Sequence, residues 1–453
     1  MGAADAGRVR LVILNYNGGP WVLRSLAHAR RLDWPAAELE LVVVDNASTD
    51  GSVEAIAAEF PDVRIIHNET NTGFPANNLA LGDLDGLRYV GLINNDGFVE
   101  PGWLAALAAE LDADPTVGAA AARMVFAPKF VDVVIASPTF TPGIGDSRDL
   151  GVMVSGLRVD GEDRWSDCQF GEGAWGVEQG RGGTFQWTAA HAVLRVPVDP
   201  AWQPGAPLPT DVELHIEAES AKKVAFISGA SEHVVEVGPT PRWVTVPVEG
   251  TPYDVIQNAG SMIFADGSGA DRGFLAPDIG QFDEPTEVFA WCGGSVLFRP
   301  DYVRQTGCFD ERFFLYYEDT DWAWRGRAQG WRYRYVPTAV MRHLHAASSG
   351  EGTPVFAYHV ERNRLLMLVK NAPVRLAVQQ VIRYALITAS YGRRDIVGPL
   401  SRGQRPNTTT TRRRVKSFIG FAKLVPAMAR SRRELRAKQT VSDRELLDWF
   451  VTR

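Results

Sequence analysis

The sequence predicts an α/β protein in which an open sheet is interrupted by an antiparallel β domain and followed by helices. Over the first 130 residues, short apolar runs alternate with helical patterns, which is typical of an open parallel sheet with helices on both faces. From residue 131 the helical periodicity disappears, and it returns near Val255. We therefore expect four regions: 1–130, an inserted β-sandwich at 131–254, 255–350 and a helical region at 351–453.

The first region contains the expected elements of the sheet. Strands are expected at residues 10–14, 39–44, 63–66 and 89–93, and helices at residues 21–30, 53–60 and 103–111. Ser48, Thr49 or Asp50 can cap the second of these helices. Asn15, Asp45 and Asp96 follow three of the strands. Ligands of open α/β sheets bind beyond the carboxyl ends of the strands, so these side chains are expected at the binding edge.

The inserted region reads as an antiparallel β-sandwich. Residues 211–219 alternate, with Val212, Leu214 and Ile216 on one face and polar residues on the other. Further short strands are expected at residues 224–227, 234–237 and 243–248. This spacing is typical of a sandwich. Three roles stay open for it: acceptor-glycan binding, self-association into a homo-oligomer, and a passive spacer.

The C-terminal region combines helices with a strong positive charge. Helices are expected at 360–369 and 376–389, a flexible linker at 401–411, and a short basic amphipathic helix at 415–425 that Pro426 ends or kinks. Residues 402–438 contain twelve Lys and Arg and one acid, whereas the whole chain has a net charge of −7. Two alternatives follow: the basic helix lies on an anionic membrane surface, or it packs on the acidic catalytic domain.

The amino-acid composition indicates the kind of cellular compartment in which the protein is expected. Hydrophobic residues make up 45% of the 453 residues and charged residues 22%, as in soluble globular proteins. The three cysteines form no disulfide framework, which favours a reducing compartment. Residues 1–10 contain no secretion signal, and no apolar stretch reaches the ~18 residues of a membrane span. We expect a cytoplasmic protein, either free or peripheral on the inner face of the cell membrane.

Two acidic clusters carry the chemistry. Asp96, in Asn94-Asn95-Asp96, follows a buried apolar strand, where a carboxylate can hold a hard divalent cation on a diphosphate. Glu318, Asp319 and Asp321 follow a run of aromatic residues. An apolar surrounding raises the basicity of a carboxylate, which suits a general base. The alternatives are a solvated turn for the first cluster and a helix start for the second.

Six segments in this order resemble the inverting GT-A glycosyltransferases of glycosyltransferase family 2, especially rhamnosyltransferase-like and galactofuranosyltransferase-like bacterial members. The segments are Val12-Ile13-Leu14-Asn15-Tyr16-Asn17, Val44-Asp45-Asn46-Ala47-Ser48-Thr49-Asp50-Gly51, Asn71-Thr72-Gly73-Phe74, Asn94-Asn95-Asp96, Cys292-Gly293-Gly294 and Glu318-Asp319-Thr320-Asp321. The resemblance covers about residues 8–130 and 255–370, and it implies a GT-A sheet. The insert lies outside the common pattern.

The resemblance implies roles for individual residues. Asp319 looks like the catalytic base, with Glu318 and Asp321 as the other candidates. Asp96 looks like the last residue of the metal-binding motif, and His343 is similar to a late metal ligand of galactofuranosyl members. Many members have a first Asp where this chain has Asn94. The residues that the resemblance assigns to the nucleotide-sugar are Asn15, Asn17, Asp45, Asn71, Gly73, Asn95, Gly293 and Gly294, with Asp45 on the nucleobase.

The expected function is transfer of a sugar from a UDP- or dTDP-sugar to a glycan or lipid-linked acceptor in cell-surface polysaccharide synthesis, with Mg²⁺ or Mn²⁺ and no nucleic-acid partner. One alternative is a sugar-phosphate nucleotidyltransferase, but its Gly-rich loop with Thr-Arg is replaced here by residues 15–21. Another is a catalytically inactive sugar-binding protein with a lectin-like sandwich. The intact acids at 318–321 argue against that alternative.

Overall fold

The computed structural model describes residues 7–143, 145–180, 183–199, 208–344 and 353–452. These residues form two units. The first consists of Met1–Val125, Gln257–Phe274 and Gly280–Arg453, and the second of Phe126–Ile256 and Leu275–Ile279. The expected boundary between residues 350 and 351 lies outside the described residues, as do residues 1–6 of the N-terminal segment.

The first unit is organised around a mixed sheet. In the described part of the chain this sheet has ten strands, in the order β21-β23-β6-β22-β4-β1-β2-β3, with β18 paired to β6 and β5 to β23. They are β1 (Arg8–Asn15), β2 (Leu39–Asp45), β3 (Arg64–His67), β4 (Leu87–Asn94), β5 (Gly97–Val99), β6 (Val117–Phe126), β18 (Ile256–Asn258), β21 (Thr286–Glu287), β22 (Ser295–Phe298) and β23 (Arg332–His343). The first four strands are parallel, and β22 runs antiparallel to β4 and β6.

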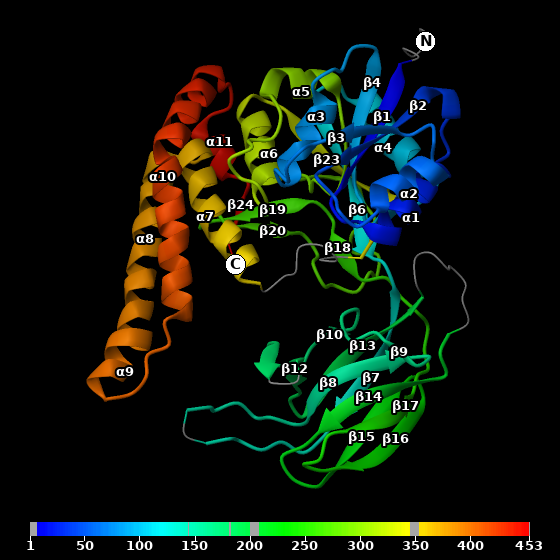
Figure 1. Cartoon of the computed structure of the whole chain (residues 1–453), viewed down its shortest axis with the longest axis vertical. Coiled ribbons are helices and arrows are strands. Elements are labelled where there is room, and N and C mark those ends of the chain that lie inside the picture. Colours follow the sequence, from blue (N-terminus) through cyan, green and yellow to red (C-terminus); the bar gives the residue numbers. More distant parts are fainter. Residues whose placement is uncertain (1–6, 144, 181–182, 200–207, 345–352, 453) are drawn as a thin grey trace. The chain divides into compact units, whose positions relative to one another are not determined.

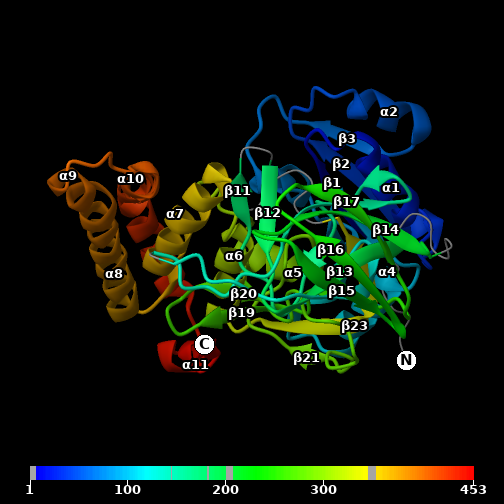
Figure 2. The same cartoon turned by 90° about the horizontal axis from the view of Figure 1, so that it is seen from below.

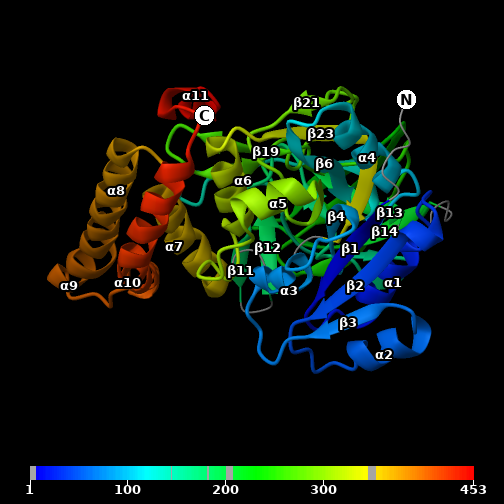
Figure 3. The ribbon, with the colours of Figure 1, turned by 90° about the horizontal axis from the view of Figure 1, so that it is seen from above.

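Helices cover this sheet, and α4 shows how an apolar stripe attaches a helix to it. The stripe of α4 (Trp103–Ala113) includes Leu104, Leu107 and Leu111, which are fully buried in the core shared with the strands. Figure 3 shows β1, β2 and β3 side by side, with α2 beyond β3. The other helices of this part are α1 (Gly19–Ala29), α2 (Ser52–Glu59), α3 (Asn78–Leu81), α5 (Pro300–Thr306) and α6 (Glu318–Ala328).

The second unit is an antiparallel β-sandwich. Its described strands form two sheets, β10-β13-β7-β15-β16 and β11-β12-β8-β14-β17, with β9 paired to β8. Val212, Leu214 and Ile216 of β14 face a core built from both sheets, as their alternation predicts. The strands are β7 (Lys129–Ala136), β8 (Met153–Val159), β9 (Glu162–Asp163), β10 (Gln169–Phe170), β11 (Glu178–Gly180), β12 (Gly183–Trp187), β13 (His191–Asp199), β14 (Asp211–Glu217), β15 (Lys222–Ser228), β16 (Ser231–Val237) and β17 (Arg242–Pro247).

The C-terminal part of the first unit is a layer of long helices. α10 packs on α7 and α8, and Figures 1 and 2 show α8 and α10 side by side. α10 is helical through Pro426, so of the two expected effects of this proline, an end or a kink, the end is wrong. The threonines of the expected linker start α10 instead. The helices are α7 (Pro354–Asn371), α8 (Val374–Gly392), α9 (Gly398–Ser401), α10 (Thr409–Lys438) and α11 (Asp443–Leu447).

A small sheet joins the end of the chain to the first unit. β19 (Ser261–Phe264) and β20 (Gly269–Asp271) form a hairpin, and β24 (Phe450–Val451) pairs in parallel with β19. The sequence patterns did not predict these strands. The predicted fold class, an open α/β sheet with an inserted antiparallel β-sandwich and a helical C-terminal region, is confirmed. In the described part of the chain, no helix has the length and apolar character needed to cross a membrane.

Candidate active site

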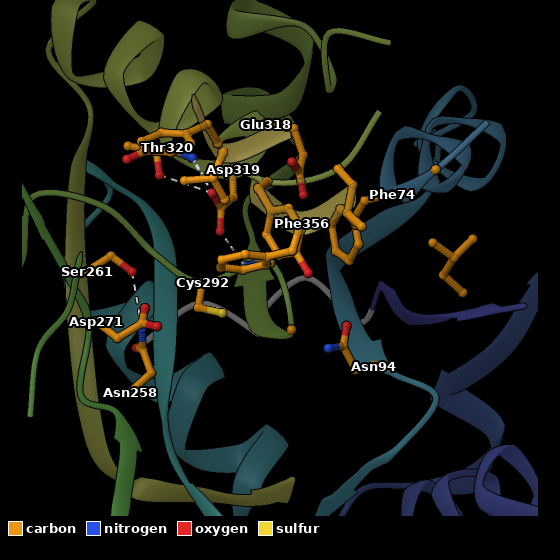
Figure 4. Close-up of a pocket in the computed structure, with 18 of the residues that line it drawn as sticks. Phe74, Asn94, Asn258, Ser261, Asp271, Cys292, Glu318, Asp319, Thr320 and Phe356 are labelled. Carbon is orange, nitrogen blue, oxygen red and sulfur yellow. Dashed lines mark hydrogen bonds between the residues drawn. The ribbon is translucent and has the colours of Figure 1, made fainter. Parts of the chain in front are cut away.

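A cavity of about 630 Å³ lies at the carboxyl ends of the parallel strands of the first unit. Its walls come from the end of β4, the loop at 71–74, the hairpin β19–β20, the turn at 292–294, the start of α6 and the start of α7. Figure 4 shows Glu318 and Asp319 at the start of α6, Asn94 at the strand edge and Asp271 on the hairpin. This is the edge at which ligands of open α/β sheets bind.

Asp319 is held at the cavity from two sides. Its Oδ1 accepts hydrogen bonds from the backbone nitrogen and the hydroxyl of Thr320, at 2.5 and 3.1 Å, and its Oδ2 accepts one from the Gly293 nitrogen at 3.3 Å. Burial raises the pKa of Asp319, and the hydrogen bonds oppose that rise. A fixed carboxylate of increased basicity is suited to remove a proton from a hydroxyl group.

Glu318 lines the same cavity as Asp319, but its carboxyl group has a different protonation state. It is 6% exposed, and its Oε2 has no hydrogen-bond partner within the described residues. Burial raises the pKa of Glu318 well above its usual range, and the adjacent charge of Asp319 raises it further. Of two neighbouring carboxyl groups, the one with fewer hydrogen bonds is the one that stays protonated. The negative charge of the pair is therefore carried by Asp319.

Asp321 does not line the cavity, although the sequence grouped it with the two other acids. It is 0% exposed. Its Oδ2 lies 3.1 Å from Arg325 Nε and 2.7 Å from Lys370 Nζ, and its Oδ1 accepts a hydrogen bond from Asn371 at 2.7 Å. The structure thus separates Asp321 from the cavity carboxylates and places it in a buried ion-pair network that ties α6 to α7.

The loop before α6 has an unusual backbone. Phe314, Tyr316 and Tyr317 have φ angles of 66°, 68° and 69°, in the left-handed region that side chains with a Cβ rarely adopt. Each such residue costs on the order of 1–3 kcal/mol, so the surrounding structure must hold it in place. The loop ends at the residue before Glu318. Its strained conformation therefore determines where α6 begins and, with it, the positions of the carboxyl groups of Glu318 and Asp319.

The side chain of Asn363, on α7, holds this loop. Its Nδ2 donates to the backbone oxygens of Phe313, Leu315 and Tyr316 at 2.8, 2.8 and 2.7 Å. Arg362 adds a hydrogen bond from Nη2 to the Phe313 oxygen at 2.8 Å. Sequence reasoning missed both residues. No sequence signal distinguished them, because Arg362 and Asn363 stand in the polar run Glu361-Arg362-Asn363-Arg364 and are recognised only by their burial in the fold.

The loop at 71–74 interlocks with the same segment. Gly73 has a φ of 75°, and a Cβ placed on it would lie 1.9 Å from the Phe314 oxygen, so only glycine fits. The Phe74 nitrogen donates to that oxygen at 2.8 Å. Asn71 accepts hydrogen bonds from the Gly73 nitrogen and from Asn46 Nδ2, both at 2.9 Å. Asn71 and Gly73 line the cavity and also shape its wall.

A second cavity of about 490 Å³ lies at the end of β2. Asp45 lines it together with Thr49 and other residues of the β2–α2 turn. Asn15 is fully buried, and its Nδ2 donates to Asp45 Oδ1 at 3.3 Å and to Ser52 Oγ at 2.9 Å. Asn17 Oδ1 accepts from the Thr49 nitrogen at 2.8 Å. Asn15 and Asn17 thus fix the strand-end turns, while Asp45 is placed at a cavity.

The turn at 292–294 and the end of β4 narrow the first cavity. A Cβ on Gly293 would lie 2.7 Å from the Phe74 ring, and one on Gly294 would lie 3.1 Å from Asn94 Nδ2. Both glycines therefore keep space that a side chain would fill. Asn95 also lines this cavity and is 9% exposed.

Asp96 and His343 come together although 246 positions separate them in the chain. His343 Nδ1 lies 2.9 Å from Gln257 Oε1, an atom that only accepts, so Nδ1 is assigned the proton. His343 Nε2 lies 2.9 Å from Asp96 Oδ1 and 3.0 Å from Asn94 Nδ2. A lone pair facing a carboxylate at this distance fits a divalent cation or a proton between the two atoms. Among the described residues no group of three or more His, Cys, Asp or Glu could hold a metal.

The hairpin adds cavity residues that the sequence did not reveal. Asp271 Oδ1 accepts a hydrogen bond from Asn258 Nδ2 at 2.5 Å, and Asn258 Nδ2 also donates to Ser261 Oγ at 3.2 Å. Figure 4 shows these three side chains grouped apart from Asn94. No motif marks them, because they come together only when the hairpin forms.

Comparisons with known proteins agree with the expected family. Residues 11–150 match the family profile described as glycosyl transferase family 2. The N-acetylglucosaminyl-diphospho-decaprenol L-rhamnosyltransferases of two Mycobacterium tuberculosis strains are 44% identical over 69 residues, which are 15% of this chain and 22% of theirs. The chain therefore matches about a fifth of the length of these curated relatives. The resemblance to family 2 is confirmed, and the sequence match itself extends over the first third of the chain.

Several solved structures resemble this chain only distantly, with TM-scores below 0.4. They are GalNAc-T7 with UDP, GalNAc and Mn²⁺ (12% identity, 80% of this chain and 50% of that chain, TM-score 0.39), a Pyrobaculum calidifontis mannosyltransferase with GDP-Man and Mn²⁺ (14%, 98% and 81%, 0.37) and S. aureus TarS (13%, 97% and 89%, 0.37). TM-scores below 0.5 support no functional comparison, so the assignment of the site depends on its own geometry.

We predict that Asp321→Ala destabilises the protein by roughly 3–5 kcal/mol, because it leaves the buried Arg325 and Lys370 without their shared carboxylate. Urea unfolding followed by circular dichroism measures this. The control is Asp301→Asn, which removes the charge of an exposed carboxyl on α5 and should leave the free energy of unfolding nearly unchanged. An Asp321→Ala protein of normal stability but without activity would instead assign Asp321 to the chemistry.

The raised pKa of Glu318 predicts a pH-dependent gain in stability for Glu318→Gln. Folding raises this pKa, so above about pH 4.5 the folded wild type binds more protons than the unfolded chain, and its stability falls as the pH rises. Glutamine removes this loss. The variant should equal the wild type in stability below pH 4.5 and become increasingly more stable than the wild type as the pH rises toward 7. Thermal melts across this range test the prediction, and a gain confined to low pH contradicts it.

Proposed function

We propose that this protein is an inverting glycosyltransferase that moves a sugar from a nucleoside-diphosphate donor to a hydroxyl group of a glycan or lipid-linked acceptor. The observation that carries the proposal is one cavity that contains both the partly buried carboxylate of Asp319 and the strand-end pair Asp96 and His343. The match to the family 2 profile supports the same reaction class.

Asp319 acts as the general base. It accepts the proton of the acceptor hydroxyl while the oxygen of that hydroxyl forms a bond to the anomeric carbon of the donor. The bond from this carbon to the diphosphate oxygen breaks, and the diphosphate leaves with the electron pair. Attack from the face opposite the leaving group inverts the anomeric configuration in one displacement. Neutral Glu318 keeps a second negative charge away from the reacting oxygen.

Asp96 and His343 are the residues that would hold Mg²⁺ or Mn²⁺. Such a cation supplies positive charge to the leaving diphosphate. Gln257 accepts from Nδ1 of His343 and so directs its Nε2 toward Asp96. Asp96 and His343 would be the two protein ligands of such a cation, and two protein ligands are compatible with Mg²⁺, which commonly binds proteins through few side chains together with phosphate oxygens.

The donor and acceptor occupy different sides of the strand edge in this proposal. Asp45, in the second cavity, accepts a hydrogen bond from the ring N–H of a pyrimidine, which suits a UDP- or dTDP-sugar. Gly293 and Gly294 leave room for the donor sugar, and Asp271 with Ser261 offers polar groups to acceptor hydroxyls.

The acceptor class and the location complete the proposal. The relative matched over 69 residues acts, by its name, on N-acetylglucosaminyl-diphospho-decaprenol, which supports a lipid-linked acceptor in cell-surface polysaccharide synthesis. We place the enzyme at the inner face of the membrane, in contact with anionic lipid through the helical C-terminal region that includes the basic segment 402–438.

A donor screen tests the function directly. Thermal melts with a panel of UDP-, dTDP- and GDP-sugars, with and without Mn²⁺, identify the donor because a ligand of the folded state raises the melting temperature. Transfer from that donor to an acceptor, with the anomeric configuration of the product read by NMR, then tests inversion. A protein that no nucleotide-sugar stabilises, or a product with retained configuration, overturns the proposal.

We predict that Asp319→Asn lowers the transfer rate by ~10²–10⁴ while the dissociation constant of the donor stays within a few-fold of wild type. The amide keeps the size and planar shape of the carboxylate, but it cannot accept a proton and its Nδ2 replaces one of the two accepting oxygens. Single-turnover kinetics and calorimetric donor titration are the measurements. Asp301→Asn, at an exposed carboxyl of α5, is the control with normal transfer. A near-normal rate in the Asp319 variant shifts the role to another base.

Asp96→Ala and His343→Ala should each raise the Mn²⁺ concentration needed for donor binding by about tenfold or more, because each removes one of two protein ligands. Donor titrations at several Mn²⁺ concentrations measure this shift. His28→Ala, at a partly buried histidine outside the cavity, is the matched control. An unchanged Mn²⁺ dependence in either variant removes that residue from the cation site.

A further inference from the structure

The outer face of α8 carries large apolar side chains in contact with solvent. Val374, Val378, Ile382 and Leu386 are 62%, 52%, 54% and 66% exposed. They follow one another at intervals of four residues and so form a continuous stripe along the helix. Isolated exposed aliphatic residues are ordinary on protein surfaces, but a stripe of four on one helix face marks a contact surface.

The opposite face of α8 is fixed against the rest of the helical layer. Tyr384 is buried, donates a hydrogen bond to Glu361 of α7 at 2.8 Å and stacks on Phe418 of α10 with ring centroids 6.0 Å apart. Ala377 and Gln380 are buried on the same side. The helix therefore cannot rotate to hide its apolar stripe. Figures 1, 2 and 3 all show α8 at the border of the first unit that is remote from β1 and β2.

The stripe lies in a segment of strong positive charge. From Val374 to Arg433 the sequence has fourteen Lys and Arg and one acid, Asp395, which pairs with Arg394 at 2.5 Å. Arg375 and Arg383 are exposed on α8 itself, next to the stripe. At the far end of α8, Arg393, Arg402 and Arg405 are also exposed. Apolar side chains with adjacent cations are the combination that binds the interface of an anionic bilayer.

The basic helix expected to lie on a membrane, residues 415–425, packs most of its apolar side chains against α7 and α8. Phe421 is buried at 4% exposure, and Phe418 stacks on Tyr384. Arg413 and Arg414 pair with Glu361 at 3.2 and 3.3 Å. The apolar residues of α10 therefore pack on α7 and α8, and the larger exposed stripe belongs to α8.

We propose that the outer face of α8 is a membrane-docking surface, with the helix parallel to an anionic bilayer and the aliphatic stripe inserted between the headgroups. A second copy of this chain is a less suitable occupant, because it would bring an equally positive surface against the first. This surface is separate from the catalytic cavity, and the proposal goes beyond the proposed function: it names the helix face that contacts the lipid.

Vesicle cosedimentation tests the docking surface. Wild-type protein should bind phosphatidylglycerol vesicles and bind phosphatidylcholine vesicles weakly, because only the first attract the cations. The double variant Ile382→Gln, Leu386→Gln should lower the partition coefficient for phosphatidylglycerol by about tenfold or more, since it removes half of the stripe. The control Val177→Gln, Val234→Gln changes residues that are 65% and 53% exposed on the other unit, and it should bind as wild type does.

The remaining outcomes are decisive as well. Equal binding by the double variant and the wild type overturns the proposal. Sedimentation velocity of both proteins without lipid tests the second copy: a wild-type dimer that the double variant abolishes assigns the stripe to self-association instead. Circular dichroism melts confirm that the exposed substitutions leave the fold intact. Transfer to a water-soluble acceptor is measured separately, so a failure of docking and a failure of the proposed function are distinguishable.

Discussion

The position of Asp319 depends on a single amide group, the Nδ2 of Asn363, which binds three backbone oxygens of the loop before α6. Left-handed conformations at three aromatic residues persist only when other contacts compensate for their cost. Those contacts come from α7, which is not part of the sheet. The position of the loop before α6 therefore depends on the helical layer as well as on the sheet. The carboxylate of Asp319 follows directly after this loop.

The first turn of α6 gives two acids, two positions apart, opposite environments. Asp319 faces the cavity with three neutral hydrogen-bond donors, and burial raises its pKa. Asp321 faces the interior, where Lys370 and Arg325 compensate its charge. Asp321 forms the ion pairs that attach α6 to α7. Asp319 has no such structural role and is therefore available as a base. The same division explains why similar residues in one short motif need not share a role.

Sequence reasoning located what depends on local pattern. The strands of the first region, the helix α4 and the alternation of β14 follow from apolar periodicity, and the structure confirms them. The strand ends at Asp45 and Asp96 follow from the same pattern. The resemblance alone gave Asp96 and His343 a common role as metal ligands; in the structure His343 Nε2 lies 2.9 Å from Asp96 Oδ1, and the role stays a prediction.

The rest depends on tertiary contacts that no local window contains. Asn363 and Asp271 acquire their positions from segments far away in the sequence. Pro426 does not end α10, although an internal proline costs about 3 kcal/mol, because Phe421 and Met428 are buried on either side of it. Burial of a long helix on its neighbours outweighs one lost backbone hydrogen bond.

The larger segment of the second unit, Phe126–Ile256, is connected at both of its ends to two adjacent strands of the sheet. β6 carries the chain out and β18 carries it back, and these two strands are paired. A segment of more than a hundred residues therefore begins and ends at neighbouring positions of the sheet. β6 and β18 pair with each other as two strands joined by a short turn would. Such an arrangement lets a lineage gain, lose or exchange the whole module without moving any strand that builds the catalytic edge.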